Sequence, residues 1–304
     1  MTEFREDSTF LVETIDFLIV GTVRNVEKTI EKDVERFIKV FSSLGVFRIF
    51  LVESDSDDMT LKILGKLALE NDHFDFETLG RLADKIPNRI DRLQFCRNRY
   101  LLKFKTDQKL ASTSFVVVAD FDGINNDLEA SALRNALERN QEWNALFANS
   151  SRRYYDILAL RHPVWCPNNA FEDTESLASH VGYATAKQIC VYNKMVNIPQ
   201  SADLIPVISA FGGLAIYRAS CLKDFDYSPT SKDRAGDIDH VILNRKIHSS
   251  SGKLYIDPNL INTKWNQHNL MSIKFLRELN YLSNKLNLKR LRNFLKFIQE
   301  IIIK

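Results

Sequence analysis

The sequence predicts an α/β protein with a mostly parallel central sheet flanked by helices. Short apolar runs, rich in β-branched and aromatic residues, alternate with longer segments whose apolar residues recur at helical spacing. Alternation of this kind is typical of parallel sheets covered on both faces. No internal repeat and no long linker interrupts the pattern, so residues 15–265 are expected to form one domain, preceded by an extension at 1–14 and followed by a tail at 266–304.

Composition excludes several other classes of protein. The chain has 304 residues, of which 45% are hydrophobic and 26% charged, as in ordinary globular proteins. Its formal net charge of +2 gives no indication of nucleic-acid binding. Four cysteines without a CxxC pair support neither a zinc ribbon nor a disulfide framework. With an acidic, polar start and no apolar run long enough to span a membrane, the chain is expected to be cytoplasmic, or peripheral at the inner face of the cytoplasmic membrane.

The first half contains the clearest elements. Residues 15–22 and 47–54 are predicted as buried strands because their apolar runs are too short for helices. A helix capped by Asn25 is expected between them, ending near Gly45. The further elements expected here are a helix after Asp57 and Asp58, a strand in 73–79, a helix from 89 to 104 and a strand in 112–123.

The second half shows a looser pattern. The expected elements are helices at 128–137, 172–197 and 236–252, and strands at 143–150, 154–160, 207–218 and 253–258. A glycine pair interrupts the strand at 207–218, and the acids Asp237 and Asp239 open the last helix.

The strongest chemical signal is Asp120-Phe121-Asp122 at the end of the strand in 112–123. Ligands of open α/β sheets bind beyond the carboxyl ends of strands. Alternate residues there point the same way, so the two carboxylates are expected to converge on one Mn²⁺ or Mg²⁺ ion, which would hold a diphosphate. Short acidic pairs also cap helices in many proteins, but the apolar strand before this pair favours the metal site.

A second acidic cluster follows the strand at 47–54. Asp57 and Asp58 are suited to capping the next helix, whereas Glu53 and Asp55 are candidates to bind a ribose or nucleobase. Positive charge for a nucleotide diphosphate is expected from Arg24 and from the helix that carries Arg97 and Asn98.

The late acids and a histidine form a third candidate group. Asp237 and Asp239 would either cap the helix at 236–252 or act on the substrate as bases, and His240 is a candidate third metal ligand. Trp165 is a candidate for stacking on an acceptor sugar.

Six motifs together resemble a known family: GTVRNVE, LVESDSDDMT, RNRYL, VVVADFDG, FGGLAIYR and DIDHVIL. They resemble glycosyltransferases of the GT-A fold, most closely the capsule-associated fungal mannosyltransferase family and its bacterial relatives, over about residues 15–260. Where that family tends to have Glu before the late His, this chain has Asp239.

The resemblance implies a sugar transfer from a nucleotide-diphosphate donor to a hydroxyl group. It places Asp120 and Asp122 at an Mn²⁺ or Mg²⁺ site, with the nucleotide cradled by residues 15–126. Residues 127–265 would form the acceptor half, in which Gly212 and Gly213 allow close backbone approach. The acceptor would be a glycan or a lipid-linked sugar in the synthesis of a surface polysaccharide such as capsule or lipopolysaccharide.

Two alternatives remain open from the sequence. A sugar nucleotidyltransferase also uses an α/β sheet and carboxylate-bound Mg²⁺, although the glycine-rich, lysine-containing loop expected after the first strand is missing. The other alternative is a non-catalytic protein of the same fold that binds a nucleotide or glycan.

The tail differs in charge from the rest of the chain. Residues 272–304 contain eight Lys or Arg and two Glu, with apolar residues at three- and four-residue steps. This pattern predicts amphipathic helices that bind an anionic membrane surface or pack in a homodimer.

Overall fold

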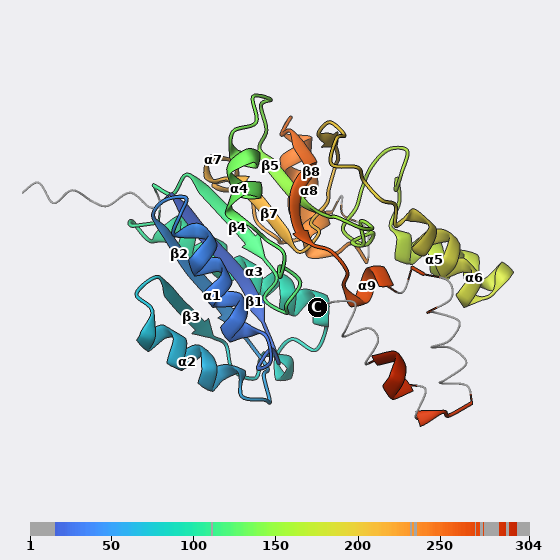
Figure 1. Ribbon diagram of the computed structural model, residues 1–304, viewed down its shortest axis with the longest axis horizontal. Coiled ribbons are helices and arrows are strands. Elements are labelled where there is room, and N and C mark those ends of the chain that lie inside the picture. Colours follow the sequence, from blue (N-terminus) through green and yellow to red (C-terminus); the bar gives the residue numbers. More distant parts are fainter. Residues whose placement is uncertain are drawn as a thin grey trace, which may run out of the picture.

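A central sheet of eight strands organises the residues that the computed structural model describes, which are 16–110, 112–231, 233, 236–270, 272–273, 276, 286–289 and 292–296. Its strand order is β3-β2-β1-β4-β7-β5-β8-β6. Helices cover both faces of the sheet (Figure 1). The predicted α/β class is confirmed.

The strands divide into a parallel half and a mixed half. β1 (Phe17–Val23), β2 (Phe47–Glu53), β3 (Phe74–Thr78) and β4 (Phe115–Ala119) are parallel. The mixed half consists of β5 (Ala145–Ser150), β6 (Ile205–Pro206), β7 (Leu214–Arg218) and β8 (Leu254–Thr263). In it β5 and β8 are parallel, while β7 runs antiparallel to β4 and β5, and β6 runs antiparallel to β8.

The labelled helices of the described residues connect consecutive strands, except α9, which follows β8. They are α1 (Ile30–Phe41), α2 (Thr60–Glu70), α3 (Arg89–Thr106), α4 (Ala130–Leu137), α5 (Ala170–Val181), α6 (Tyr183–Cys190), α7 (Ala219–Leu222), α8 (Asp239–Ser249) and α9 (Gln267–Leu270). Two short 3₁₀ turns lie at Leu82–Asp84 and Tyr192–Lys194.

Alternating side chains of the strands build two cores, one on each face of the sheet. In β1, Leu18 and Val20 pack with residues of α3 and α8, whereas Phe17 and Ile19 pack with residues of α1, α2 and α4. Because successive strand residues point to opposite faces, a strand buried on both sides reads as a continuous apolar run. This is why the sequence revealed β1, β2 and β4 so clearly.

Antiparallel β7 brings residues from the second half to the edge where β1, β2 and β4 end. Leu214, at the start of β7, pairs with Ala119 at the end of β4. The residues just before β7 therefore lie beside those just after β4, and the backbone N–H of Asp120 donates to the carbonyl of Gly213 at 3.0 Å. The carboxyl end of β5 reaches the same edge, since β5 is antiparallel to β7.

Two predicted strands of the second half are wrong in whole or in part. Residues 154–160 contain a turn at 157–159 and no strand, because the Asp156 carboxylate accepts from the backbone N–H groups of Gly212 and Ala159. The strand predicted at 207–218 begins only at Leu214, because Gly212 and Gly213 have φ of +69° and +82°.

Two helix boundaries also differ from the prediction. α1 begins at Ile30, and Asn25 has φ of 54° and accepts from the N–H of Asp57 in place of capping α1. The helical segment predicted at 172–197 is divided at Gly182, which has φ of +80°.

Most of the predicted C-terminal tail lies outside the described residues. Of residues 266–304, the structure describes α9 and short segments after it, including helical backbone at 292–296. In the part of the chain that can be described, no helix is both long and apolar enough to cross a bilayer.

Candidate active site

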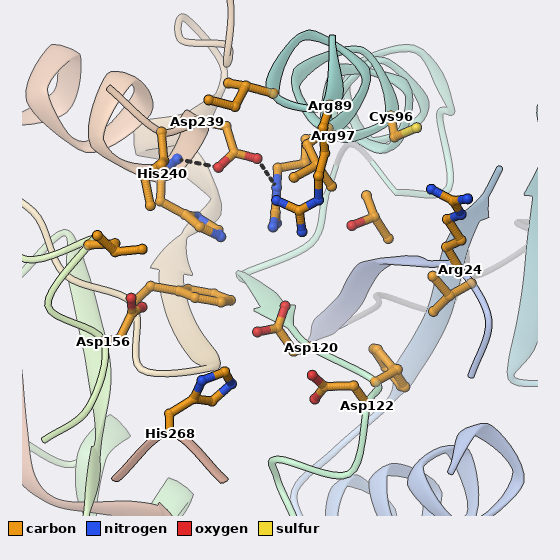
Figure 2. A pocket seen from close by; sticks show the side chains of 18 of the residues that line it. Arg24, Arg89, Cys96, Arg97, Asp120, Asp122, Asp156, Asp239, His240 and His268 are labelled. Carbon is orange, nitrogen blue, oxygen red and sulfur yellow. Dashed lines mark hydrogen bonds and ion pairs between the residues drawn. The ribbon is translucent and has the colours of Figure 1, made fainter. Parts of the chain in front are cut away.

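A cavity of about 770 Å³ lies at the carboxyl ends of β1, β2 and β4 (Figure 2). Predicted site residues that line it are Arg24, Asp55, Arg97, Asp120, Asp122, Asp239 and His240. They come from segments more than 200 residues apart in the sequence, and the sheet topology brings them to one edge. Parallel strands are expected to present ligand-binding residues there.

Asp120 and Asp122 face the cavity with carboxylates that no cation neutralises among the described residues. Burial, together with the nearby charge of Asp122, raises the pKa of Asp120 to about 8, even though Arg97 acts in the opposite direction. The backbone of Asp120 is held by Gly213 and by the side-chain amide of Asn125, which donates to its carbonyl at 2.7 Å. A desolvated carboxylate at Asp120 beside the exposed carboxylate of Asp122 fits a divalent cation, whose charge would offset their repulsion.

No complete metal-binding cluster is preformed. Among the residues that the structure describes, no group of three or more His, Cys, Asp or Glu is arranged to hold a metal ion. Mg²⁺ and Mn²⁺ are commonly bound by one or two carboxylates, with water and phosphate oxygens completing the coordination. The pair Asp120 and Asp122 fits that requirement.

Arginines from α3 face these acids across the cavity. Figure 2 shows Arg89 and Arg97 pointing into the cavity from the side opposite Asp120 and Asp122. Arg97 is buried and donates through Nε to Asp239, while its Nη1 has no hydrogen-bond partner among the described residues. Arg24 lines the cavity after β1 and donates through Nε to the carbonyl of Asp55 at 3.0 Å.

The start of α8 contributes Asp239 and His240. Burial tends to raise the pKa of Asp239, but the Arg97 charge and further hydrogen bonds outweigh it and hold that pKa below its ordinary value. Burial and the neighbouring Arg97 charge lower the pKa of His240 to about 3, so its imidazole is neutral. The ring stacks on Phe211 with centroids 3.7 Å apart, and neither ring nitrogen has a partner among the described residues.

Three predicted site residues make structural contacts away from the cavity lining. The Glu53 carboxylate accepts from the Ser56 N–H and the Thr78 hydroxyl, so it joins the loop after β2 to the end of β3. The side chain of Asn98 accepts from the backbone N–H of Tyr227 at 2.8 Å. The Trp165 indole donates to the carbonyl of Lys194 at 2.8 Å. These side chains are engaged within the protein, and none of the three lines the cavity.

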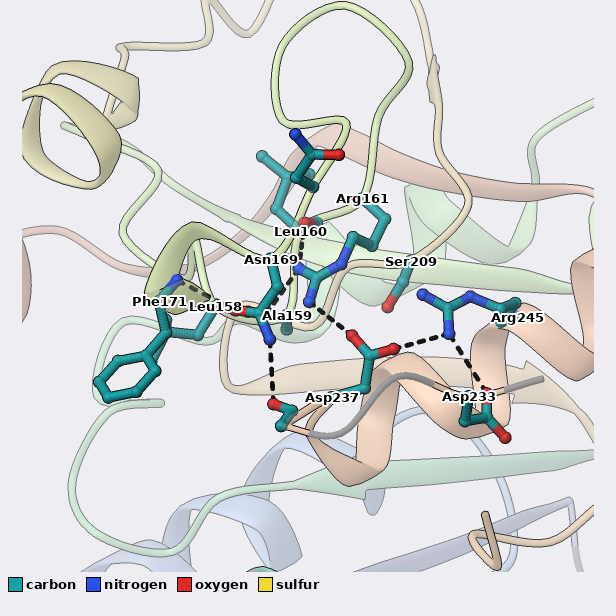
Figure 3. Close-up of polar contacts among 12 residues, drawn as sticks. Leu158, Ala159, Leu160, Arg161, Asn169, Phe171, Ser209, Asp233, Asp237 and Arg245 are labelled. Atoms are coloured by element: carbon teal, nitrogen blue, oxygen red, sulfur yellow. Dashed lines mark hydrogen bonds and ion pairs between the residues drawn. The ribbon is translucent and has the colours of Figure 1, made fainter. Parts of the chain in front are cut away.

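Asp237 also lies outside the cavity lining, although it is only two residues from Asp239. Figure 3 shows it between Arg161, whose Nη2 is 2.9 Å away, and Arg245, whose Nη1 is 2.7 Å away. Despite its burial, these two arginines hold the pKa of Asp237 below its ordinary value. The ion pairs fasten the segment before α8 to the loop after β5, so Asp237 positions α8.

The glycine pair, predicted to let a substrate approach the backbone, makes its close contacts with the protein itself. A Cβ at Gly212 would lie 2.5 Å from the carbonyl oxygen of Ala148. One at Gly213 would lie 2.7 Å from the Tyr155 hydroxyl and 2.8 Å from Ile124. Neither glycine is among the residues that line the cavity, but the carbonyl of Gly213 holds the backbone of Asp120.

Gly213→Ala is expected to lower the free energy of unfolding by about 1–3 kcal/mol, because it combines positive φ with a close contact. Gly65→Ala is the matched control, since Gly65 lies inside α2 with nothing within 4 Å of its added Cβ. That control is expected to be neutral or to stabilise by about 0.5–1 kcal/mol. Urea unfolding of both variants checks the comparison, and equal stabilities would refute it.

Asp120→Asn is expected to stabilise the metal-free protein at high pH. The folded-state pKa of Asp120 is about 8, against an ordinary value of 3.8. Ionisation of Asp120 therefore lowers the free energy of unfolding of the wild type as the pH rises between these two values. The melting temperature of the variant should therefore exceed that of the wild type by a margin that grows up to about pH 8 and then levels off. Parallel melting curves across that range would contradict this reading of Asp120.

The cavity also contains residues that the sequence analysis did not select. They include Arg89, Tyr155, Asp156, Phe211 and His268. Burial raises the pKa of Asp156, although hydrogen bonds from the backbone N–H groups of Gly212 and Ala159 oppose this rise. An acid in the middle of the apolar segment 154–160 was the one local signal available for Asp156. Arg89 and His268 stand in no recognisable motif.

Comparisons with known proteins give only structural likenesses. No protein-family model and no curated protein matches the chain. Among solved structures it is similar to S. aureus TarS (residues 1–349), with 14% identity, a TM-score of 0.44 and coverage of 80% of this chain and 58% of that one. It is also similar to the mannosyltransferase PcManGT from Pyrobaculum calidifontis in complex with GDP-Man and Mn²⁺, with 12% identity, a TM-score of 0.48 and coverage of 88% and 62%.

A third similar structure is glucosyl-3-phosphoglycerate synthase from Mycobacterium tuberculosis in complex with UDP, with 15% identity, a TM-score of 0.38 and coverage of 82% and 69%. The chain spans about three fifths of the length of the first two structures. At these identities and TM-scores, the fold assignment rests on the sheet topology and the functional assignment on the cavity.

Proposed function

We propose that the chain is a metal-dependent glycosyltransferase that moves a sugar from a nucleotide-diphosphate donor to an acceptor hydroxyl. The observation that supports this most strongly is the placement of Asp120 and Asp122 opposite Arg89 and Arg97 in one cavity. A diphosphate between them would bind guanidinium groups on one side and a carboxylate-held cation on the other.

Asp120 and Asp122 would hold the Mn²⁺ or Mg²⁺ ion, which neutralises charge on the leaving diphosphate when bound. Arg24 and Arg89 would bind phosphate oxygens, because no carboxylate pairs with either guanidinium among the described residues. Arg97 already neutralises Asp239, but its free Nη1 remains available to a ligand oxygen. These groups would position the diphosphate and stabilise its departure.

The end of the cavity near β2 suits the nucleoside of the donor. The Oδ1 atom of Asp55 accepts from the Ala83 N–H at 2.7 Å, whereas its buried Oδ2 has no hydrogen-bond partner among the described residues. Arg92 lies 3.6 Å from that oxygen and also lines the cavity. An unfilled acceptor beside a guanidinium supports binding of a ribose hydroxyl or a nucleobase N–H by Asp55.

The opposite end of the cavity is lined by the second half of the chain and suits the acceptor. Lys187, Tyr192, Gln267 and His268 contribute to this end. If the reaction inverts the sugar, Asp156 is better suited than Asp239 to act as the base, because its pKa is raised and that of Asp239 is lowered. Asp237 is engaged by two arginines outside the cavity.

Several finer expectations belong to the same proposal. They are transfer of a hexose, of the mannose type that the resemblance to the fungal family implies, to a glycan or lipid-linked acceptor of a surface polysaccharide. The basic segment 272–304 would hold the enzyme at an anionic membrane surface or join two copies. Removing residues 272–304 would abolish binding to anionic liposomes if the first role holds.

A nucleotide-sugar panel tests the proposed reaction. Purified protein is incubated with UDP- and GDP-sugars, with Mn²⁺ or with EDTA, and release of nucleoside diphosphate is measured. Mn²⁺-dependent release from one donor supports a glycosyltransferase, and absence of release from every donor contradicts it. Pyrophosphate release from a nucleoside triphosphate and a sugar 1-phosphate would instead identify a nucleotidyltransferase.

A further inference from the structure

One face of α1 holds the turn that carries Asp122. Thr29, directly before α1, donates through Oγ1 to the carbonyl of Phe121 at 3.2 Å. Asp33 accepts through Oδ2 from the N–H of Gly123 at 2.9 Å. Asp122 therefore lies between two backbone groups, one on each side, that the same helical turn binds.

The spacing along α1 makes this arrangement a single unit. Thr29, Asp33 and Phe37 follow one another at four-residue steps, which places them on one face of the helix. The Asp33 N–H bonds the Thr29 carbonyl at 2.9 Å, and the Phe37 ring stacks on the Phe121 ring with centroids 4.8 Å apart. Three residues on one face of α1 and its N-cap thus contact the segment 121–123.

Gly123 completes the fit between the helix and the turn. It has φ of +87°, which favours glycine, and a Cβ there would lie 3.2 Å from Thr29 Cγ2. The turn therefore lies close against the start of α1, and little room remains for the Asp122 backbone to shift.

Asp33 is an unusual residue for a purely structural position. Its exposed fraction is 1%, and no ion pair is recorded for it among the described residues. Burial and the nearby Asp122 charge raise its pKa to about 6, although the Gly123 N–H opposes this rise, so its charged form lowers the stability of the fold. A neutral residue of similar size would be expected at such a position if stability alone mattered.

We propose that Asp33 is a positioning residue for the cation site, which with Thr29 fixes the backbone on both sides of Asp122 and aims its carboxylate into the cavity beside Asp120. This inference rests on the proposed function, because it takes Asp120 and Asp122 as the cation ligands. Outer groups that orient metal ligands commonly contribute 10- to 100-fold in metal affinity.

Mn²⁺ affinity in the presence of UDP or GDP, measured by electron paramagnetic resonance of free Mn²⁺, tests the proposal. Asp33→Ala is expected to raise the Mn²⁺ dissociation constant at least about tenfold. Asp33→Asn should recover much of the affinity, since its amide oxygen still accepts from the Gly123 N–H. Glu31→Ala, in the same turn but exposed and paired with Lys66, is the matched control and should bind Mn²⁺ like the wild type.

Melting curves of the metal-free variants separate positioning from folding. Asp33→Asn is expected to melt no lower than the wild type, because it removes a buried charge. If Asp33→Ala does not fold, Thr29→Val provides the readout. It removes the hydroxyl that donates to Phe121 and, at 3.4 Å, to Val26, and it is expected to weaken Mn²⁺ binding several-fold. Asp33→Ala with a lowered melting temperature and unchanged Mn²⁺ affinity would show a structural role alone and overturn the inference.

Asp122→Ala distinguishes failure of this inference from failure of the proposed function. If Asp122→Ala loses Mn²⁺ binding while Asp33→Ala and Thr29→Val keep wild-type affinity, the positioning role is refuted and the metal site stands. If Asp122→Ala itself binds Mn²⁺ normally, the metal site of the proposed function is refuted.

Discussion

Replacing Asp120 or Asp122 with alanine is expected to lower kcat for sugar transfer by at least about a hundredfold, with the fold preserved. Both carboxylates face the cavity, and repulsion between them contributes to the raised pKa of Asp120. Their removal therefore takes away the cation site and this repulsion, and the hydrogen bond lost with Asp122 is the long one from the Ile124 N–H, at 3.3 Å. Turnover of the best donor in the nucleotide-sugar panel, together with circular dichroism of each variant, measures both parts of this prediction.

Asp72→Ala is the control for this experiment, because Asp72 is an exposed acid that does not line the cavity. It should retain wild-type turnover. Full activity of Asp120→Ala, or full activity of the wild type in excess EDTA, would show that these carboxylates hold no catalytic metal.

Arg97→Ala is expected to lower the free energy of unfolding by about 3–5 kcal/mol, the largest effect among these variants. It leaves the carboxylate of Asp239 buried without its partner. Arg99→Ala, two residues along the same helix, removes a more exposed pair with Glu77 and should cost about 0–1 kcal/mol. Urea unfolding of the two variants gives the comparison directly.

The double variant Arg97→Ala with Asp239→Ala separates the pair from other contacts of Arg97. If the loss comes from an unpaired buried charge, the double variant should be more stable than Arg97→Ala alone. Equal costs for Arg97→Ala and Arg99→Ala would refute the buried-pair account of how α3 and α8 are joined.

The sequence alone predicts those elements whose residue pattern lies within a few neighbouring positions. β1, β2 and β4 are apolar runs because both faces of each strand are buried, and Asp120 and Asp122 follow directly from the end of such a run. The position of an acid just beyond a parallel strand is a property of a few neighbouring residues, so it can be derived without the structure.

Residues that reach the cavity through loops could not be derived in the same way. Asp156 follows β5, which reaches the cavity edge only because β7 is antiparallel, and no local pattern specifies that reversal. His268 depends in turn on where β8 ends. The order of the strands in the sheet brings Asp156 and His268 to the cavity, and the spacing of residues along the sequence does not predict it.

The late acids show the same limit at close range. Asp237 and Asp239 are two residues apart, and the sequence treats them alike. In the structure Asp237 precedes α8 and pairs with Arg161 and Arg245, whereas Asp239 begins the helix and pairs with Arg97 inside the cavity. Partners more than 70 residues away, Arg161 and Arg97, distinguish the two acids.

Calorimetric titration of UDP and GDP into the wild type and into Asp120→Asn, each with and without Mn²⁺, tests the central claim most directly. The account predicts that one of the two nucleotides binds the wild type much more tightly when Mn²⁺ is present, and that this gain disappears in Asp120→Asn. Failure of both nucleotides to bind, or binding that is the same with and without Mn²⁺, would contradict it.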